Sequence, residues 1–226
     1  MRCLLALLLL LVVVGCGSKT GLTVPEVDAG PCSDEICNGL DDDCDGAADD
    51  GLACFFLDGE PIDSLQTRRC GSSWYSYDTP DSQSANPRPD IRVSGGVVVA
   101  IQHGDSCAGA GVAVIADLPD DGSGGELNGR FTVTPPSAAR LVVSDEPDEC
   151  LYDVRTGVGS CEWIWVNCCT DGVMLGPIET EGCVTMTLSD PLGVSTLEVL
   201  DGPDDRVARS FGVPFELCTQ IRPAVR

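Results

Sequence analysis

Basic residues are scarce in this chain of 226 residues, in which 13 Lys and Arg stand against 36 Asp and Glu and the formal charge is −23. The balance argues against nucleic acid as a partner, because binding to phosphates requires clustered Lys and Arg. The same charge repels an anionic bilayer, so any attachment to a membrane must be covalent or apolar. Cations are the partners that this composition favours.

Histidine is almost absent, since His103 is the only one, and aromatic residues make up 5% of the chain. No Cys-x-x-Cys pair is present, so His103 cannot complete a zinc site unaided. The sequence also lacks the Gly-x-Ser-x-Gly, His-Glu-x-x-His and phosphate-loop motifs. We therefore assign no catalytic residue. The neighbours Gln102 and Gly104 predict an exposed His103 at the end of a strand.

No apolar run is long enough to cross a bilayer as a helix. The run Leu4–Val14 falls short of the roughly 20 residues required and, following Arg2, predicts a secretory signal over residues 1–15. It ends in Val13-Val14-Gly15-Cys16, which resembles the lipobox of bacterial lipoproteins. The resemblance implies a diacylglycerol on Cys16 and an exported protein anchored to the outer membrane or cell surface. An ordinary signal peptide is the alternative. Residues 16–30 then form the lipidated Cys and a flexible tether.

Cysteine is abundant, with fourteen residues, of which Cys3 leaves with the signal. With Cys16 lipidated, an even number remains, which in an exported chain predicts disulfides rather than metal thiolates. These twelve are Cys32, Cys37, Cys44, Cys54, Cys70, Cys107, Cys150, Cys161, Cys168, Cys169, Cys183 and Cys218.

The positions of these cysteines predict two separately crosslinked parts, one with four cysteines and one with eight. Nested bonds in the first part, Cys37 with Cys44 and Cys32 with Cys54, would clamp the chain between them. Adjacent residues on a strand point to opposite faces, so Cys168 and Cys169 are expected to reach different partners, with a bond between them as the alternative.

The chain between Cys32 and Cys54 contains eight acids and no base. Asp residues alternate here, Gly46 follows, and the pattern matches the front half of a calcium-binding loop, in which alternate side chains and one backbone carbonyl supply oxygens. Leu52 stands where the closing Glu of such a loop is expected, and Asp50 is the candidate replacement. Solvated carboxylates without an ion are the alternative. The predicted ligands are Asp41, Asp43, Asp45, Ala47 (through its backbone carbonyl), Asp49 and Asp50.

The pattern Glu-x-Cys-Asn-Gly-x-Asp-Asp-Asp-Cys-Asp-Gly-x-x-Asp-Asp, which begins at Glu35, resembles the Cys/Asp-rich metal-binding motif of MopE-type surface proteins. The resemblance covers about residues 32–54 and implies metal binding in a family associated with copper. Copper prefers imidazole or sulfur ligands, which here are His103, Met174 and Met186, whereas carboxylates suit calcium. We therefore expect Ca²⁺ as the bound ion, in a segment of residues 31–62.

Residues 63–90 are rich in Ser, Asp and Pro and predict a linker or long loop. From residue 91 to 226, short apolar runs with period 2 alternate with turn residues, which predicts an antiparallel β-sandwich or jelly roll without a major helix. The expected strands lie at residues 92–101, 111–116, 130–134, 140–144, 162–167, 183–188, 195–200 and 214–221. The expected turns are Asp121-Gly122, Asn128-Gly129, Asp171-Gly172 and Asp201-Gly202-Pro203.

Two further features of this part have alternative interpretations. Trp163 and Trp165 share one face of a strand, which favours a core pair over a stacking platform for sugar. The acidic run of residues 144–149, or Asp171, could join a structural calcium site, although a solvated loop is favoured.

The function expected from the sequence is a cell-surface lipoprotein whose acidic segment binds a divalent cation. Its sandwich is then a binding or structural domain, with a glycan or a surface protein as its partner. Two alternatives remain open: a secreted hydrolase that attacks polysaccharide with paired carboxylates, and a surface protein that captures copper.

Overall fold

The computed structural model describes residues 32, 34–37, 42, 44, 52–66, 95–103, 109–116, 124–144, 146, 148–165 and 171–221. The chain divides into residues 1–32 and residues 33–226, and all the strands belong to the second unit. Strands dominate these residues, and the one helical element among them is the short 3₁₀ turn η3 (Pro136–Ala138). In the described part of the chain, no helix is both long and apolar enough to cross a membrane.

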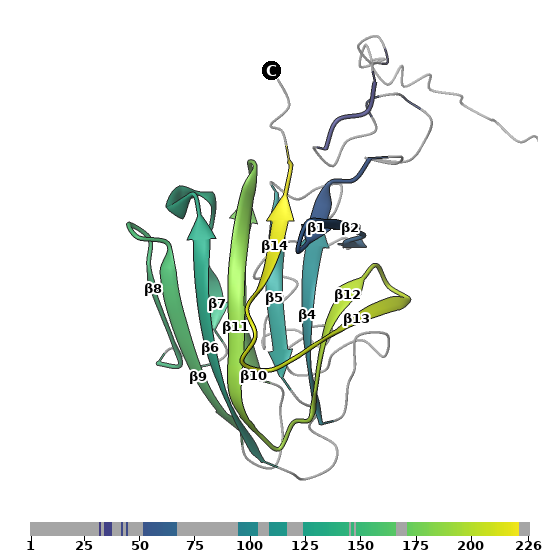
Figure 1. Ribbon diagram of the computed structural model, residues 1–226. Coiled ribbons are helices and arrows are strands. Elements are labelled where there is room, and N and C mark those ends of the chain that lie inside the picture. Colours follow the sequence, from purple (N-terminus) through teal and green to yellow (C-terminus); the bar gives the residue numbers. More distant parts are fainter. Residues whose placement is uncertain are drawn as a thin grey trace, which may run out of the picture. The chain divides into compact units, whose positions relative to one another are not determined.

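Seven strands form one sheet, here called sheet A, with neighbouring strands antiparallel (Figure 1). In spatial order they are β2 (Glu60–Ile62), β1 (Phe55–Leu57), β14 (Phe215–Thr219), β11 (Gly182–Leu192), β6 (Gly125–Thr134), β9 (Val158–Trp165) and β8 (Cys150–Asp153).

The remaining strands form sheet B, which is mixed because β4 runs parallel to two of its neighbours, β12 and β3. In order, sheet B contains β13 (Asp205–Arg209), β12 (Thr196–Asp201), β4 (Gly96–His103), β5 (Ala110–Ala116), β10 (Asp171–Ile178) and β7 (Arg140–Ser144), and β3 (Leu65–Gln66) pairs with β4 off this path. The predicted fold class, a mainly β protein with a β-sandwich, is confirmed.

The inner face of sheet A is set by strict alternation. In β6 and β9 every second residue is buried, as period 2 requires of a sheet with one solvated face. Trp163 is 1% exposed and Trp165 is also buried, so both rings lie in the core and the predicted core pair is confirmed. Neither ring can serve as a platform for sugar.

Sheet B follows a different pattern, because nearly every residue of β4, β5 and β10 is buried. Residues on one face, such as Val97 and Val114, join the core shared with sheet A. Residues on the other face form a second apolar cluster, which includes Val98, Ala113 and Met174. These strands therefore need apolar side chains on both faces.

Residues 55–66 also belong to the sandwich. The sequence interpretation placed them in the metal-binding segment and the linker, with the sandwich beginning at residue 91. In the structure β1 pairs with β14, and β3 pairs with β4. The two sheets therefore take strands from both sides of residues 67–94.

Two of the predicted turns are wrong. Asn128-Gly129 lies within β6, and Asp171-Gly172 begins β10. Gly129 serves packing instead of chain reversal, because a Cβ atom there would lie 2.7 Å from the ring of Trp163. The turn at Asp201-Gly202-Pro203 is confirmed, while Asp121-Gly122 lies outside the described residues.

Candidate functional site

The predicted calcium ligands all lie outside the described residues. Asp41, Asp43, Asp45, Ala47, Asp49 and Asp50 are all outside, as is the predicted lipidation site Cys16. Residues 34–37, 42, 44 and 52–54 are described, and these define the frame that holds the predicted ligands.

A disulfide between Cys37 and Cys54 closes this frame, with 5.5 Å between the two Cα atoms. The nested pairing predicted from the sequence is therefore wrong, because Cys37 bonds to Cys54 and not to Cys44. Burial explains why Cys37 pairs with Cys54. Cys37 and Cys54 both belong to the hydrophobic core cluster, so their bond packs against the sandwich.

One hydrogen bond connects this frame to the sandwich, and another connects two residues within the frame. The backbone N–H of Gln220 donates to the carbonyl oxygen of Cys54 over 2.9 Å, and β1 begins at the next residue. The backbone N–H of Asp42 donates to Oε1 of Glu35 over 2.7 Å, which folds the acidic chain back on itself.

No thiolate is available in this segment. Cys32 and Cys44 are disulfide-bonded, as are Cys37 and Cys54. The ligands that this stretch can offer a metal ion are therefore oxygens, which calcium and magnesium prefer.

The imidazole and thioether groups lie in the interior. His103 is 1% exposed and its ring meets the ring of Phe55 edge-on, with 5.4 Å between centroids. The prediction of an exposed His103 is therefore wrong, because β3 pairs with the end of β4 and Phe55 packs against the imidazole. Met174 and Met186 are also buried.

A second acidic cluster forms where the two sheets approach each other. Glu149 precedes β8 of sheet A, and Asp171 begins β10 of sheet B. Burial and the negative charge of Asp171 raise the pKa of Glu149 to about 7. The backbone N–H of Glu146 donates to Oε2 of Glu149 over 3.2 Å and opposes this shift. The structure thus brings together two acids from the regions that the sequence proposed separately for a calcium site.

The sulfurs of Cys183 and Cys218 lie beside the carboxylate of Glu216. They are bonded to each other, and Cys150 and Cys161 form the other disulfide described in the sandwich. Glu216 accepts a hydrogen bond from the hydroxyl of Thr185 over 3.3 Å. With the disulfide intact, this group offers a metal ion one carboxylate and no thiolate.

The outer face of sheet A contains an open groove, which the sequence did not reveal. A hollow of about 660 Å³ extends over β8, β9, β6 and β11, and a second hollow of about 440 Å³ adjoins it. Arg130, Leu151 and Ser160 line both, so we treat the two as one feature, the outer groove. Its wall residues come from four strands, and only the register of those strands brings them together.

Comparison with family models, curated proteins and solved structures found no match to this chain.

Proposed function

We propose that this protein is a lipid-anchored surface protein that binds calcium in its Cys/Asp-rich segment and presents the sandwich as a binding domain. The observation that carries the proposal is the oxidation of all four cysteines in and around the acids. With the sulfurs engaged, the segment offers oxygen ligands, which suit a hard cation.

The frame also supports the presence of a positive ion. Between Cys37 and Cys54 the chain contains six acids and no base: Asp41, Asp42, Asp43, Asp45, Asp49 and Asp50. The disulfide confines these carboxylates to one short loop. Like charges held this close disfavour ionisation of one another unless a cation neutralises them.

The copper alternative lacks accessible ligands among the described residues. His103, Met174 and Met186 are buried in the sandwich, and the cysteines of the acidic segment are oxidised. Soft or imidazole ligands are the ones that copper prefers. If the protein retained copper through dialysis against calcium, copper would replace calcium as the preferred ion.

The second candidate function is polysaccharide hydrolysis by paired carboxylates. It is favoured by the pKa of about 7 for Glu149, which lies in the range of a general acid, and by the neighbouring Asp171. Turnover of a glycan panel distinguishes this candidate from binding alone.

Calcium binding is tested by thermal unfolding of the whole mature chain with increasing calcium. Extracellular calcium modules have Kd values of about 10⁻⁴–10⁻³ M. At tenfold Kd, a ligand stabilises the folded state by about 1.4 kcal/mol, which should raise Tm by about 3–6 °C. Asp43→Ala with Asp45→Ala should abolish the rise.

The matched control is Asp204→Ala with Asp205→Ala, which removes the same charge from two exposed residues at the start of β13. It should keep the calcium response. A midpoint that stays constant up to several millimolar calcium, or a response lost equally in both double variants, would contradict the proposal.

A further inference from the structure

Within the part of the chain that the structure describes, the outer groove contains an arginine that forms no ion pair, in a chain that has few cations. Of the five arginines among the described residues, Arg155, Arg206 and Arg209 form ion pairs with acids. Arg130 and Arg140 make no side-chain hydrogen bond or ion pair within the described part of the chain, and only Arg130 lines a hollow.

Strand register places hydroxyl groups directly opposite Arg130, while Glu162 is its diagonal neighbour on β9. Arg130 lies opposite Ser160 on β9 and opposite Thr187 on β11. Side chains directly opposite each other have Cβ atoms about 5 Å apart, so these are its nearest cross-strand neighbours. Thr132, two residues along β6, points to the same face.

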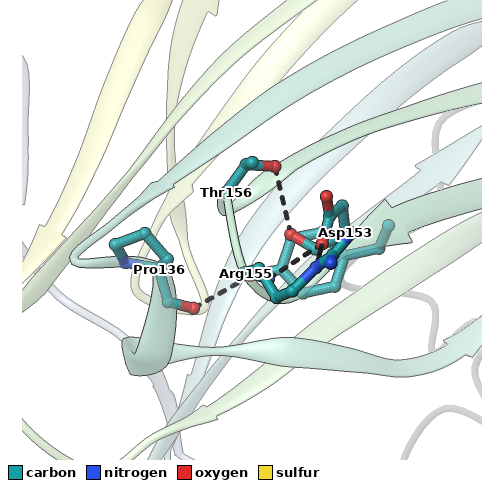
Figure 2. A network of polar contacts seen from close by, with 5 residues as sticks. Pro136, Asp153, Arg155 and Thr156 are labelled. Carbon is teal, nitrogen blue, oxygen red and sulfur yellow. Dashed lines mark hydrogen bonds and ion pairs between the residues drawn. The ribbon is translucent and has the colours of Figure 1, made fainter.

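Asp153 is the acid that lines the larger hollow, and its side chain accepts hydrogen bonds from Arg155. Asp153 is the last residue of β8, and its Oδ1 accepts from the backbone N–H of Arg155 over 2.9 Å and from Nε of the same residue over 3.4 Å (Figure 2). These bonds hold the pKa of Asp153 below its ordinary value, chiefly through the backbone N–H. Glu216 accepts from the hydroxyl of Thr185.

The same end of the groove offers apolar surface. Leu151 is 72% exposed and Val158 is 51% exposed, and both line the larger hollow. Exposed aliphatic side chains beside hydroxyl groups suit a ligand with C–H faces and polar edges. The volume of about 660 Å³ lies within the range of small-molecule sites.

We propose that the outer groove binds a short acidic saccharide, with the sugar carboxylate on Arg130 and the rings over Leu151, Val158 and the threonines. The guanidinium of arginine presents paired donors that match a carboxylate, whereas the hydroxyls and aliphatic groups match a sugar ring. The net negative charge of the protein does not prevent this, because screening acts over about 8 Å at physiological salt and the local groups decide.

The other hollow fixes the direction of the ligand. It is lined by Asp148, Glu149, Glu162 and Asp190, which repel a carboxylate. Asp190 is engaged by Asn128 Nδ2 over 3.4 Å and by the Ser189 hydroxyl over 3.0 Å. An acidic saccharide therefore extends from Arg130 toward Val158 and away from these acids.

The proposal is tested by calorimetric titration of the full mature chain with trigalacturonate, in EDTA and 0.15 M salt. EDTA removes any contribution from a calcium-loaded acidic segment, so this test stands or fails separately from calcium binding. Arg130→Gln should weaken binding at least about tenfold, because a charge-assisted pair is lost. Arg130→Lys should weaken it less, since the charge remains and the paired donors do not. The methyl ester of trigalacturonate should bind the unmodified protein about as weakly as the acid binds Arg130→Gln.

Arg140→Gln is the matched control, because it removes the same charge from another arginine without an ion pair, on sheet B. It should leave the Kd for trigalacturonate unchanged. Thr187→Val, which keeps the shape and removes a hydroxyl, should weaken binding about threefold. The proposal is overturned if trigalacturonate fails to bind, if Arg130→Gln binds it as tightly as the unmodified protein, or if equimolar sulfate displaces it.

Discussion

The two sheets of this protein are stabilised in different ways. Sheet A has one solvated face, and two disulfides join its strands, Cys150–Cys161 between β8 and β9 and Cys183–Cys218 between β11 and β14. Sheet B is buried on both faces in β4, β5 and β10. No disulfide among the described residues joins two of its strands. Covalent crosslinks thus accompany the sheet that buries less apolar surface, and the solvated face is where a groove can form.

The largest effect should come from a charge on the outer face of sheet B. Ala113→Asp places a carboxylate in the second apolar cluster, where Ala113 is fully buried. An unpaired buried charge should cost about 4–5 kcal/mol or prevent folding, as measured by denaturant unfolding. Thr187→Asp, on the outer face of sheet A, should cost only about 1 kcal/mol, the span of strand propensities. Equal losses in the two variants would mean that the sheets do not differ as described.

A smaller effect is expected from removing a crosslink of sheet A. Cys183→Ser with Cys218→Ser opens a loop with a sequence separation of 35 residues, and Cys150→Ser with Cys161→Ser one with a separation of 11. Chain-entropy arguments give losses of about 4 and about 3 kcal/mol, respectively. Hydrogen exchange should accelerate in β11 and β14 before it does in β4 and β5. Uniform acceleration across both sheets would contradict the comparison.

The smallest effect concerns the acids between the sheets. The raised pKa of Glu149 means that the folded state binds more protons than the unfolded state between pH 4.5 and about 7. The free energy of unfolding therefore falls as the pH rises through this window. Above the window, the stabilisation that comes from protonating Glu149 is fully lost. Glu149→Gln removes this slope and, because the side chain is only partly buried, should stabilise the protein by about 1 kcal/mol at pH 8.

Chemical denaturation at several pH values measures this slope. Glu126→Gln, at an exposed position on β6, reports the effect of changing the net charge alone. A Glu149→Gln variant that keeps the full pH dependence of the unmodified protein would show that the two sheets do not meet at a repulsive acid pair.

The fold class was predictable because strand periodicity is a local property. Val184, Met186 and Leu188 alternate with polar residues, and the structure places these three in the core. The strands β1, β2, β3, β8, β10 and β13 were not predicted. In β10, Asp171-Gly172 carries the signal of a turn, but pairing with β5 overrides it. In β6, Gly129 carries the same signal, but its real partner is Trp163, which is 34 residues away in the sequence.

The candidate sites differ in the same way, because one is local in the sequence and the other depends on strand pairing. The acidic segment is continuous in the sequence, so its composition could be interpreted directly, whereas its pairing of cysteines depends on which sulfurs reach the core. The outer groove could not be predicted, since Arg130, Ser160 and Thr187 become neighbours only through the register of β6 with β9 and β11. The approach of Glu149 to Asp171 likewise requires the two sheets to be in place.

The Cys37–Cys54 bond also has a mechanical consequence. Tension applied at Cys37 passes through the sulfur–sulfur bond into β1, because this bond connects Cys37 directly to the residue that precedes β1. Shear applied at that point would load the crosslink and the ladder between β1 and β14.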